Sequence, residues 1–343
     1  MLQRLLYIGY YFKQLDWEKL KSFIDFAKKT TDKSGLKLFL GMLIDSYRYK
    51  ISLLEYYQFG FYRGVSNSEK ENWAGTGYMF EYQKVMNPLG KREILNDKTL
   101  FHKKYKDYFK HHVLDLAEMR LKPSSVQDML KMPKVVLKES EGKCGLGTAF
   151  VDSKGYTPES IVSYMEQSGF DLAETYITQH PDLNRLSPSG VNTVRIFTQL
   201  NAKNEVEILG CRQRVSVNSP VDNLAAGNLA ATIDEKTGII VGAAVYSDIT
   251  KAKEEFHPIT KVEFAGFQIP FWQECLDLVK KAALEHPQNR SIGWDIVITS
   301  EGPGLIEGNH DWCKLVWQLP VNQGLKPILE NHLKEYKKNE HIN

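Results

Sequence analysis

The chain has 343 residues, of which 42% are hydrophobic, and it carries a net charge of +2. That length and composition suffice for a well-buried core spread over two or three subdomains. The near balance of acidic and basic residues gives no electrostatic reason to expect a nucleic acid partner.

The cysteines and the N-terminal segment bear on where the protein works. Cys144, Cys211, Cys275 and Cys313 are far apart and form no CxxC pair. This spacing argues against a structural metal site or a disulfide framework and favours a reducing compartment. The N-terminal apolar run lacks a small-residue cleavage site, and no apolar run approaches a bilayer-spanning length. We expect a cytoplasmic protein without a transmembrane segment and leave association with a membrane surface open.

Helical patterns dominate the first 130 residues. In "DWEKLKSFIDFAKK", Asp16 can cap a helix whose apolar residues, including Leu20 and Phe23, fall at helical spacing. The segment "LGMLIDSYRYKISLLEYYQFGFYRG" is rich in aromatic residues, which suggests core, and "NDKTLFHKKYKDYFKHH" predicts a basic, aromatic helix. We therefore expect a helical N-terminal region at 1–92 and a helical linker at 93–130.

Strand patterns take over from residue 134 onward. They occur in "KVVLKES", "TAFVD", "VNTVRIFTQL", "VEILGCRQRVSV", "AATID", "GIIVGAAVYSD", "DIVIT" and "GLIEGN". Helical patterns interrupt them at "PESIVSYMEQSG" and "FWQECLDLVKKAALEHP", and "LKPILENHLKEYKK" predicts a last helix. The expected fold class is α+β, with mainly antiparallel sheets and flanking helices. We place two β-rich units at 131–185 and 186–343.

A hairpin with acidic residues stands out near the C-terminus. The segment "GWDIVITSEGPGLIEGN", residues 293–309, predicts two apolar strands joined near Glu301. Asp295 then lies roughly opposite Glu307, and Glu307 shares a face with Asn309 because side chains alternate. Opposed carboxylates are unfavourable unless a cation lies between them, and oxygen ligands of this kind suit Mg²⁺. The alternative is a solvated hairpin edge, which the apolar flanks disfavour.

A glycine-rich loop follows the first strand of the β-rich part. In "VVLKESEGKCGLGTAFVD", Lys138 ends a strand, and Gly142, Gly145 and Gly147 loosen the loop after it. Such a loop lets backbone N–H groups approach phosphate oxygens, and the lysine supplies a counter-charge. A strand follows where a Walker A or Rossmann loop requires a helix. A hairpin tip that binds nothing is an equally good interpretation of this segment alone.

Two arginines fall on neighbouring strands. If "VNTVRIFTQL" and "VEILGCRQRVSV" pair around a turn at Ala202 and Lys203, Arg212 is a diagonal neighbour of Arg195 on the same face. Guanidinium groups held together need anions, and phosphate or acyl-phosphate oxygens fit their fork. Salt bridges to the protein's own carboxylates are the alternative. Beside the other two motifs, we assign both arginines to substrate.

Taken in order, these segments resemble the ATP-grasp superfamily, and within it the sugar-transfer-associated branch found near polysaccharide biosynthesis functions. The resemblance runs from about Lys98 to Gln318. "NDKTLFHKKY" is similar to the segment that carries a first phosphate-binding lysine, here Lys98, and "VVLKESEGKCGLG" to the second lysine and a glycine-rich lid. It implies an ATP-grasp fold, with the lid and adenine linker in 131–185 and the metal site in 186–343.

The resemblance also implies a nucleotide site. "DLAETYITQHPDLNRLSPSGVNTVRIFT" resembles the adenine-binding linker, so that Glu174 would meet the adenine amino group. The backbone of Tyr176 and Ile177 would pair with the base edge, and Asp182 could reach the ribose. The nucleotide-binding set implied in this way is Lys98, Lys138, Ser140, Gly142, Gly145, Gly147, Glu174, Tyr176, Ile177 and Asp182.

Two further segments complete the resemblance. "GWDIVITSEGPGLIEGN" is similar to the metal-binding end, with Asp295, Glu307 and Asn309 as ligands of one or two Mg²⁺ ions. "VDNLAAGNLAATID" resembles the family's DN-x-x-x-G-G loop, although Asn228 stands where a second glycine is usual.

The implied activity is ATP- and Mg²⁺-dependent ligation. A substrate carboxylate would attack the γ-phosphate to give an acyl-phosphate, and an amine would displace phosphate, with Lys138, Arg195 and Arg212 as catalytic residues. The expected partners are small-molecule carboxylate and amine substrates, possibly sugar-linked, in surface-polysaccharide assembly, and an oligomer is possible. The alternatives are a kinase on the same scaffold and a non-catalytic nucleotide-binding partner of a glycosyltransferase.

Overall fold

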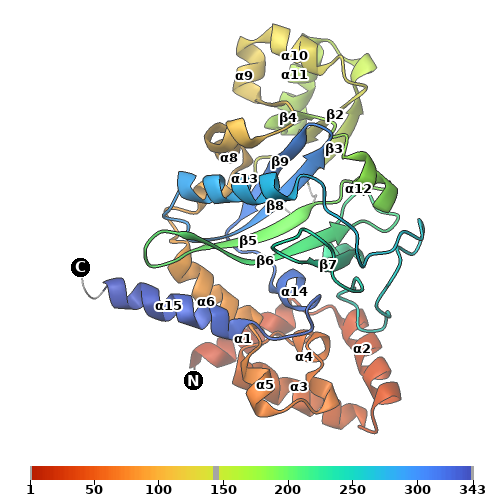
Figure 1. Ribbon diagram of the computed structural model, residues 1–343, viewed down its shortest axis with the longest axis vertical. Coiled ribbons are helices and arrows are strands. Elements are labelled where there is room, and N and C mark those ends of the chain that lie inside the picture. Colours follow the sequence, from red (N-terminus) through yellow and green to blue (C-terminus); the bar gives the residue numbers. More distant parts are fainter. Residues whose placement is uncertain (1, 142–146, 341–343) are drawn as a thin grey trace.

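The computed structural model describes residues 2–141 and 147–340. Its elements form three tiers along the long axis (Figure 1). A helical tier lies at one end, a five-stranded sheet occupies the middle, and a four-stranded sheet covered by helices lies at the other end. In these ranges no helix has the length and apolarity needed to cross a bilayer.

The N-terminal tier is built from helices around an aromatic core. They are α1 (Leu2–Lys13), α2 (Trp17–Thr30), α3 (Gly35–Tyr49), α4 (Glu55–Gln58) and α5 (Asn67–Glu71), with a 3₁₀ turn at Phe61–Arg63. As predicted, Asp16 caps α2 by accepting from the Lys19 N–H at 2.9 Å, and Leu20 and Phe23 are buried. The tyrosines and phenylalanines of residues 56–62 are buried too, which confirms that this aromatic segment is core.

Three helices lead from this tier to the upper sheet: α6 (Thr76–Met86), α7 (Glu93–Asn96) and α8 (Lys98–Tyr105). Asp97 caps α8 and accepts from the N–H groups of Thr99 and Leu100. The predicted basic helix ends at Tyr105, and a single 3₁₀ turn, Lys106–Tyr108, follows it.

The upper sheet has the strand order β1-β4-β2-β3, and all its neighbours are antiparallel. Its strands are β1 (Val113–Asp115), β2 (Lys134–Lys138), β3 (Thr148–Asp152) and β4 (Leu172–Thr175). The helices α9 (Leu116–Leu121), α10 (Pro123–Met129) and α11 (Pro158–Ser168) share a core with the sheet. The sheet therefore takes its first strand from the segment that the sequence suggested was a helical linker.

The central sheet has the order β7-β6-β5-β8-β9 and is also antiparallel. Its strands are β5 (Val194–Leu200), β6 (Val206–Val215), β7 (Leu229–Ile233), β8 (Ser291–Thr299) and β9 (Gly302–Asn309). Helix α13 (Trp272–Glu285) covers one face, and α14 (Lys314–Gln318) and α15 (Lys326–Glu340) lie on the other (Figure 1). Both faces are covered, which is why β5 is buried at every residue.

One strand prediction is wrong. The segment "GIIVGAAVYSD" was expected to be a strand. Residues 234–271 instead form a long loop between β7 and α13 that contains isolated β-bridges and no continuous strand. Ile240 and Ala244 are nevertheless fully buried and pack with α13 in the core. The apolar residues thus reflect burial of a loop. A short apolar run occurs in buried loops as well as in strands, so the pattern alone does not distinguish them.

Candidate nucleotide and metal site

The acidic hairpin lies where β8 and β9 pair, and its register agrees with the sequence. Asp295 is opposite Glu307, and the amide nitrogen of Asn309 donates to a Glu307 carboxylate oxygen at 3.0 Å. The three side chains are therefore brought together on one face. Asp295 is buried, whereas Glu307 and Asn309 are half-buried.

The charges of this cluster are unequal. Burial alone would raise the pKa of Asp295, but the guanidinium groups of Arg195 and Arg214 hold that pKa well below its usual range. Burial and the neighbouring charge of Asp295 raise the pKa of Glu307. Glu307 is thus the carboxylate of this pair that lacks a full counter-charge.

The donor set fits a hard cation. The described residues contain no group of three or more His, Cys, Asp or Glu side chains placed to hold a metal, but here two carboxylates are completed by an amide. Such oxygen donors suit Mg²⁺, which usually keeps waters and takes other ligands from phosphates. A divalent ion beside Glu307 would also relieve its repulsion from Asp295. To contribute an oxygen, Asn309 must turn its amide away from Glu307.

Lys138 of the upper sheet is held by an ion pair. Lys138, at the end of β2, forms an ion pair with Glu174 of β4 at 2.6 Å, and His111 lies 3.4 Å from the same carboxylate. Although burial opposes it, Lys138 and His111 lower the pKa of Glu174 to about 2. The ion pair holds the ammonium group at the strand end, where a phosphate could share it.

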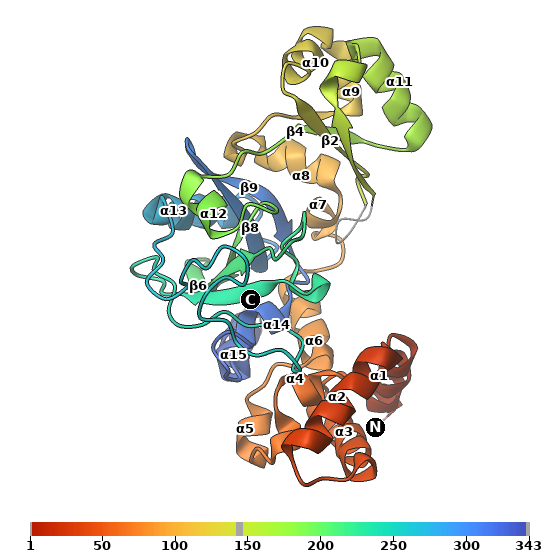
Figure 2. The same ribbon diagram turned by 90° about the vertical axis from the view of Figure 1, so that its right-hand side faces the viewer.

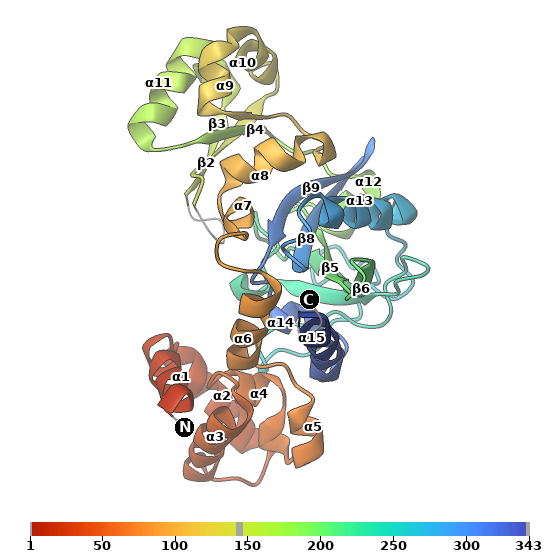
Figure 3. The ribbon, with the colours of Figure 1, turned by 90° about the vertical axis from the view of Figure 1, so that its left-hand side faces the viewer.

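Lys98 connects the two tiers electrostatically. It opens α8, and its ammonium group donates to the Glu139 carbonyl at 2.9 Å. Burial and the charge of Lys138 lower the pKa of Lys98, whereas Glu307 and Glu174 oppose that shift. Lys98 is therefore within Coulombic reach of both Lys138 and the metal-site carboxylate Glu307, and its helix α8 lies between the upper sheet and β9 (Figure 3).

The base of the glycine-rich loop is anchored on both sides. The Ser140 N–H donates to Asp171 at 2.7 Å, and the Ser140 carbonyl accepts from the Lys98 N–H at 3.1 Å. Gly147 has a φ of +70°, a backbone conformation that favours glycine. Gly142 and Gly145 lie outside the described residues.

The linker from the upper sheet to the central sheet follows β4 (Figure 2). The Tyr176 N–H donates to the Lys134 carbonyl at 3.3 Å, so base pairing at this residue would use its carbonyl oxygen. Ile177 is half-buried in the extended segment that follows. The His180 N–H then donates to the carbonyl of Ile298, at the end of β8, at 2.7 Å. Asp182 is exposed in the first turn of α12 (Pro181–Leu186).

The arginine arrangement differs from the prediction in one respect. A bulge between Phe197 and Thr198 shifts the register, so Arg195 pairs directly with Arg212 and not diagonally. Arg195 forms an ion pair with Asp295, but Arg212 turns away and donates to the Trp317 carbonyl at 3.1 Å. Arg212 thus fastens α14 beneath the sheet in this structure, away from the metal-site cluster.

Arg214 is the residue that sequence reasoning missed. It lies two residues after Arg212 on the same face, and it bridges Asp295 at 2.8 Å to Asp222 and Asn223 at 2.7 Å. Strand alternation in "CRQRV" could have identified it. It connects the metal-site carboxylate to the loop that resembles the DN motif.

The hydrogen bonds of this loop account for Asn228, which stands where the family motif usually has a second glycine. The side chain of Asn228 is fully buried. Its oxygen accepts from the Val217 N–H at 2.8 Å, and its nitrogen donates to the carbonyls of Val221 at 2.7 Å and Asn223 at 3.1 Å. Asn228 therefore supplies side-chain hydrogen bonds that close the loop.

A family model described as "Sugar-transfer associated ATP-grasp" matches residues 79–334. No curated protein matches. The family match and the fold thus define an ATP-grasp protein. The chain belongs to the sugar-transfer associated ATP-grasp family, which confirms the family and fold expected from the sequence.

The chain is also similar, at low identity, to solved structures. One is PurK, N5-carboxyaminoimidazole ribonucleotide synthetase, in an ADP complex, with 9% identity, a TM-score of 0.40 and coverage of 64% of this chain and 45% of that one. Another is the ATP-grasp ligase PsnB complexed with precursor peptide PsnA2 and AMPPNP, with 11% identity, a TM-score of 0.44 and coverage of 76% and 67%. A third is a RimK domain ATP-grasp protein from Sphaerobacter thermophilus DSM 20745, with 12% identity, a TM-score of 0.36 and coverage of 68% and 69%. The chain thus spans less than half the length of PurK.

Proposed function

We propose that the protein is an ATP- and Mg²⁺-dependent ligase that joins a carboxylate to an amine through an acyl-phosphate. The observation that best supports the proposal is the position of Lys98, which donates to the Glu139 carbonyl beside the glycine-rich loop and feels the charges of both Lys138 and Glu307. Transfer of a phosphoryl group requires positioning and neutralisation of charge more than covalent chemistry. Two lysines would position and neutralise the phosphates, and the hairpin carboxylates would do the same through bound Mg²⁺.

Each group of site residues has a distinct role in this proposal. Lys98 and Lys138 bind the phosphates, and the loop that begins at Ser140 and includes Gly142, Gly145 and Gly147 covers them. Asp295, Glu307 and Asn309 hold one or two Mg²⁺ ions, which neutralise charge on the triphosphate. Glu174, the backbone of Tyr176 and Ile177, and Asp182 bind the adenosine. The ion pair between Lys138 and Glu174 keeps the ammonium group in place before nucleotide arrives.

The substrate carboxylate and its acyl-phosphate need cationic groups on the sheet. Arg195 and Arg214 are best placed, because both contact Asp295 at the metal edge. Arg212 serves this role less well than expected from the sequence, since its guanidinium donates to carbonyls at α14. Exclusion of water by the loop would protect the acyl-phosphate from hydrolysis until the amine displaces phosphate.

The family description supports a sugar-related setting. We propose that the substrates are a uronic acid or amino acid and an amine, joined in the cytoplasm during surface-polysaccharide assembly. The test is a screen of uronic acids and amino acids in pairs with ATP and Mg²⁺. A ligase releases ADP and free phosphate in equal amounts and yields a product with the mass of both substrates less one water.

Two other outcomes would overturn this proposal. ADP release without free phosphate, together with a phosphorylated product, would identify a kinase on the same scaffold. ATP binding without turnover for any pair would identify a non-catalytic nucleotide-binding protein.

The site assignment has its own test. Glu307→Gln and Lys138→Ala should each reduce ADP release at least about a hundredfold, since each removes charge stabilisation at the transferring phosphate. The matched controls are Glu274→Gln on α13 and Lys154→Ala just after β3. Both side chains are exposed, and both variants should retain full turnover. Full turnover in either site variant would contradict the assignment.

A further inference from the structure

Helix α3 of the N-terminal tier is apolar on two opposite faces. Leu38 and Met42 on its inner face are fully buried. On its outer face, the exposed fractions of Leu36, Leu40 and Ile44 are 70%, 48% and 63%. A helix that is apolar on both sides is usually covered on both sides. The outer face of α3 has no such cover among the described residues, and it lies at the end of the molecule opposite the upper sheet (Figure 1).

The spacing of the outer residues is that of a helix-packing seam. Leu36, Leu40, Leu43 and Tyr47 follow one another at intervals of four, three and four residues. Leu36 and Leu40 are exposed, whereas Leu43 and Tyr47 are half-buried and Leu43 also packs against the core of the tier. This alternation brings one side chain per turn to a common stripe and is the pattern with which two helices interdigitate. The stripe is thus shaped for another helix.

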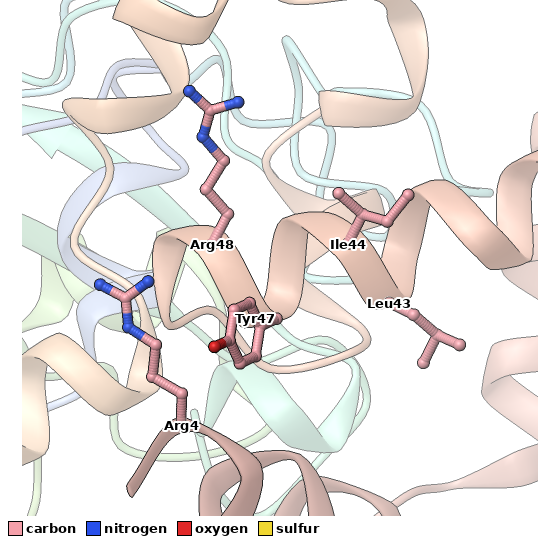
Figure 4. A pocket seen from close by; sticks show the side chains of 5 residues that line it. All are labelled: Arg4, Leu43, Ile44, Tyr47 and Arg48. Carbon is pink, nitrogen blue, oxygen red and sulfur yellow. The ribbon is translucent and has the colours of Figure 1, made fainter. Parts of the chain in front are cut away.

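A hollow beside the stripe supplies the second observation. It measures about 470 Å³ and is lined by Arg4 of α1 and by Leu43, Ile44, Tyr47 and Arg48 of α3. Figure 4 shows the two arginine side chains extending to the same side of the hollow. Among the described residues neither guanidinium has a carboxylate ion-pair partner; each lies over a tyrosine ring. The hollow is shallow and open, so a helix lying along α3 could reach the side chains that line it.

The two helices that border the stripe, α1 and α3, expose basic side chains and no carboxylate. Helix α1 has no acidic residue, and the one acid of α3, Asp45, is buried and paired with Lys70 at 2.7 Å. Residues 1–50 contain ten Lys and Arg and five Asp and Glu, a net charge of +5, whereas the rest of the chain carries −3. Like charges disfavour a second copy of this surface, and acidic residues on the occupant would complement it.

We propose that the outer face of α3 is the docking site for an acidic amphipathic helix of a partner protein. The leucine stripe receives the apolar face of that helix, and Arg4, Lys37 and Arg48 pair with carboxylates along its edges. The proposal is independent of the reaction at the nucleotide site.

The test uses the full chain and two designed peptides of about three heptads, labelled with fluorescein. Both carry leucine at the seam positions; one carries glutamate and the other lysine at the flanking positions. Fluorescence anisotropy should show binding of the glutamate peptide and at least about tenfold weaker binding of the lysine peptide. Leu40→Glu should weaken binding at least about tenfold, because one seam contact is lost and a like charge is added.

Controls separate docking from misfolding. Leu121→Glu changes a leucine that is 80% exposed on α9, and it should leave binding within twofold. Leu40→Ser is a milder second variant, and circular dichroism and an unchanged thermal midpoint show that each variant is folded. Equal binding of the two peptides, or an unaffected Leu40→Glu variant, would overturn the proposal. So would co-sedimentation with phosphatidylglycerol vesicles, or self-association in sedimentation velocity, that Leu40→Glu abolishes while no peptide binds.

Discussion

Glu307 is the residue whose protonation links the metal site to stability. Burial and Asp295 raise its pKa in the fold, so the protonated side chain stabilises the folded state at low pH. That stabilisation is lost as the pH rises through the folded-state pKa, which lies above the ordinary value of a glutamate side chain. Mg²⁺ requires the ionised carboxylate and should therefore stabilise the protein most at high pH.

This gives a prediction that separates stability from activity. Glu307→Gln cannot ionise, so without metal it should raise the melting temperature by about 1–3 °C near pH 8 and have little effect near pH 4. The same variant should lose the stabilisation that Mg²⁺-ADP gives the unchanged chain at high pH. Differential scanning calorimetry at both pH values, with and without Mg²⁺-ADP, measures both effects. A lower metal-free melting temperature for Glu307→Gln at pH 8 would contradict the assigned role.

Arg214 neutralises two buried carboxylates at once. Replacing it by alanine leaves Asp295 and Asp222 each without one partner in a buried site, which should cost about 3–5 kcal/mol in the free energy of unfolding. The matched control is Arg120→Ala, which breaks an exposed ion pair with Glu166 and should cost less than about 1 kcal/mol. Urea denaturation of both variants measures these losses. Equal losses in the free energy of unfolding would show that Arg214 contributes no more to stability than an exposed arginine.

The elements differ in how well local patterns predicted them. The hairpin of β8 and β9 followed from alternation, because a register error would move every apolar residue to the wrong face. The loop at 234–271 did not, because buried loops and strands are equally apolar over short runs. The bulge in β5 and β6 lies at Gly210, which has a φ of +146°. An isolated glycine inside a strand pattern is a signal for a bulge, but it does not show which way the Arg212 side chain turns.

Asn228 provides a prediction at the scale of the loop between β6 and β7. Asn228→Gly restores the glycine usual in the family motif but removes three side-chain hydrogen bonds of a fully buried residue. It should lower the free energy of unfolding by about 1–3 kcal/mol. Asn322→Gly is the control, because Asn322 is exposed with a φ of +49°, where glycine costs little. Chemical denaturation distinguishes the two, and an unchanged midpoint for Asn228→Gly would show that the loop closes without these bonds.

Across the whole molecule, a buried ion pair fastens the helical tier to the central sheet. Lys314 of α14 contacts Glu55 of α4 at 2.8 Å, and Glu55 also accepts from the N–H groups of Ser52 and Thr76. Burial alone would lower the pKa of Lys314, but Glu55 raises it. The ammonium is therefore held charged between the two tiers, five residues after the metal-site asparagine.

Loss of this contact should lower the free energy of unfolding of the whole chain. Lys314→Met leaves the Glu55 carboxylate buried without its counter-charge and should cost about 3–5 kcal/mol, whereas Glu55→Gln/Lys314→Met should recover much of that loss. Lys104→Met, which breaks the half-exposed pair with Glu285, is the matched control. Additive losses in a double-mutant cycle by urea denaturation would show that the two residues are not coupled.

The sequence by itself determined the family, the fold class and the pairing of Asp295 with Glu307. The family and fold class follow from the order of motifs, and the pairing follows from strand alternation about the turn, although a register shift between Asp295 and Ile296 interrupts that alternation. Only the tertiary structure decided which arginine meets the metal-site carboxylate, how Asn228 closes its loop and where the outer stripe of α3 lies. The physical reason is that these features depend on contacts between residues far apart in the chain, so no short segment encodes them.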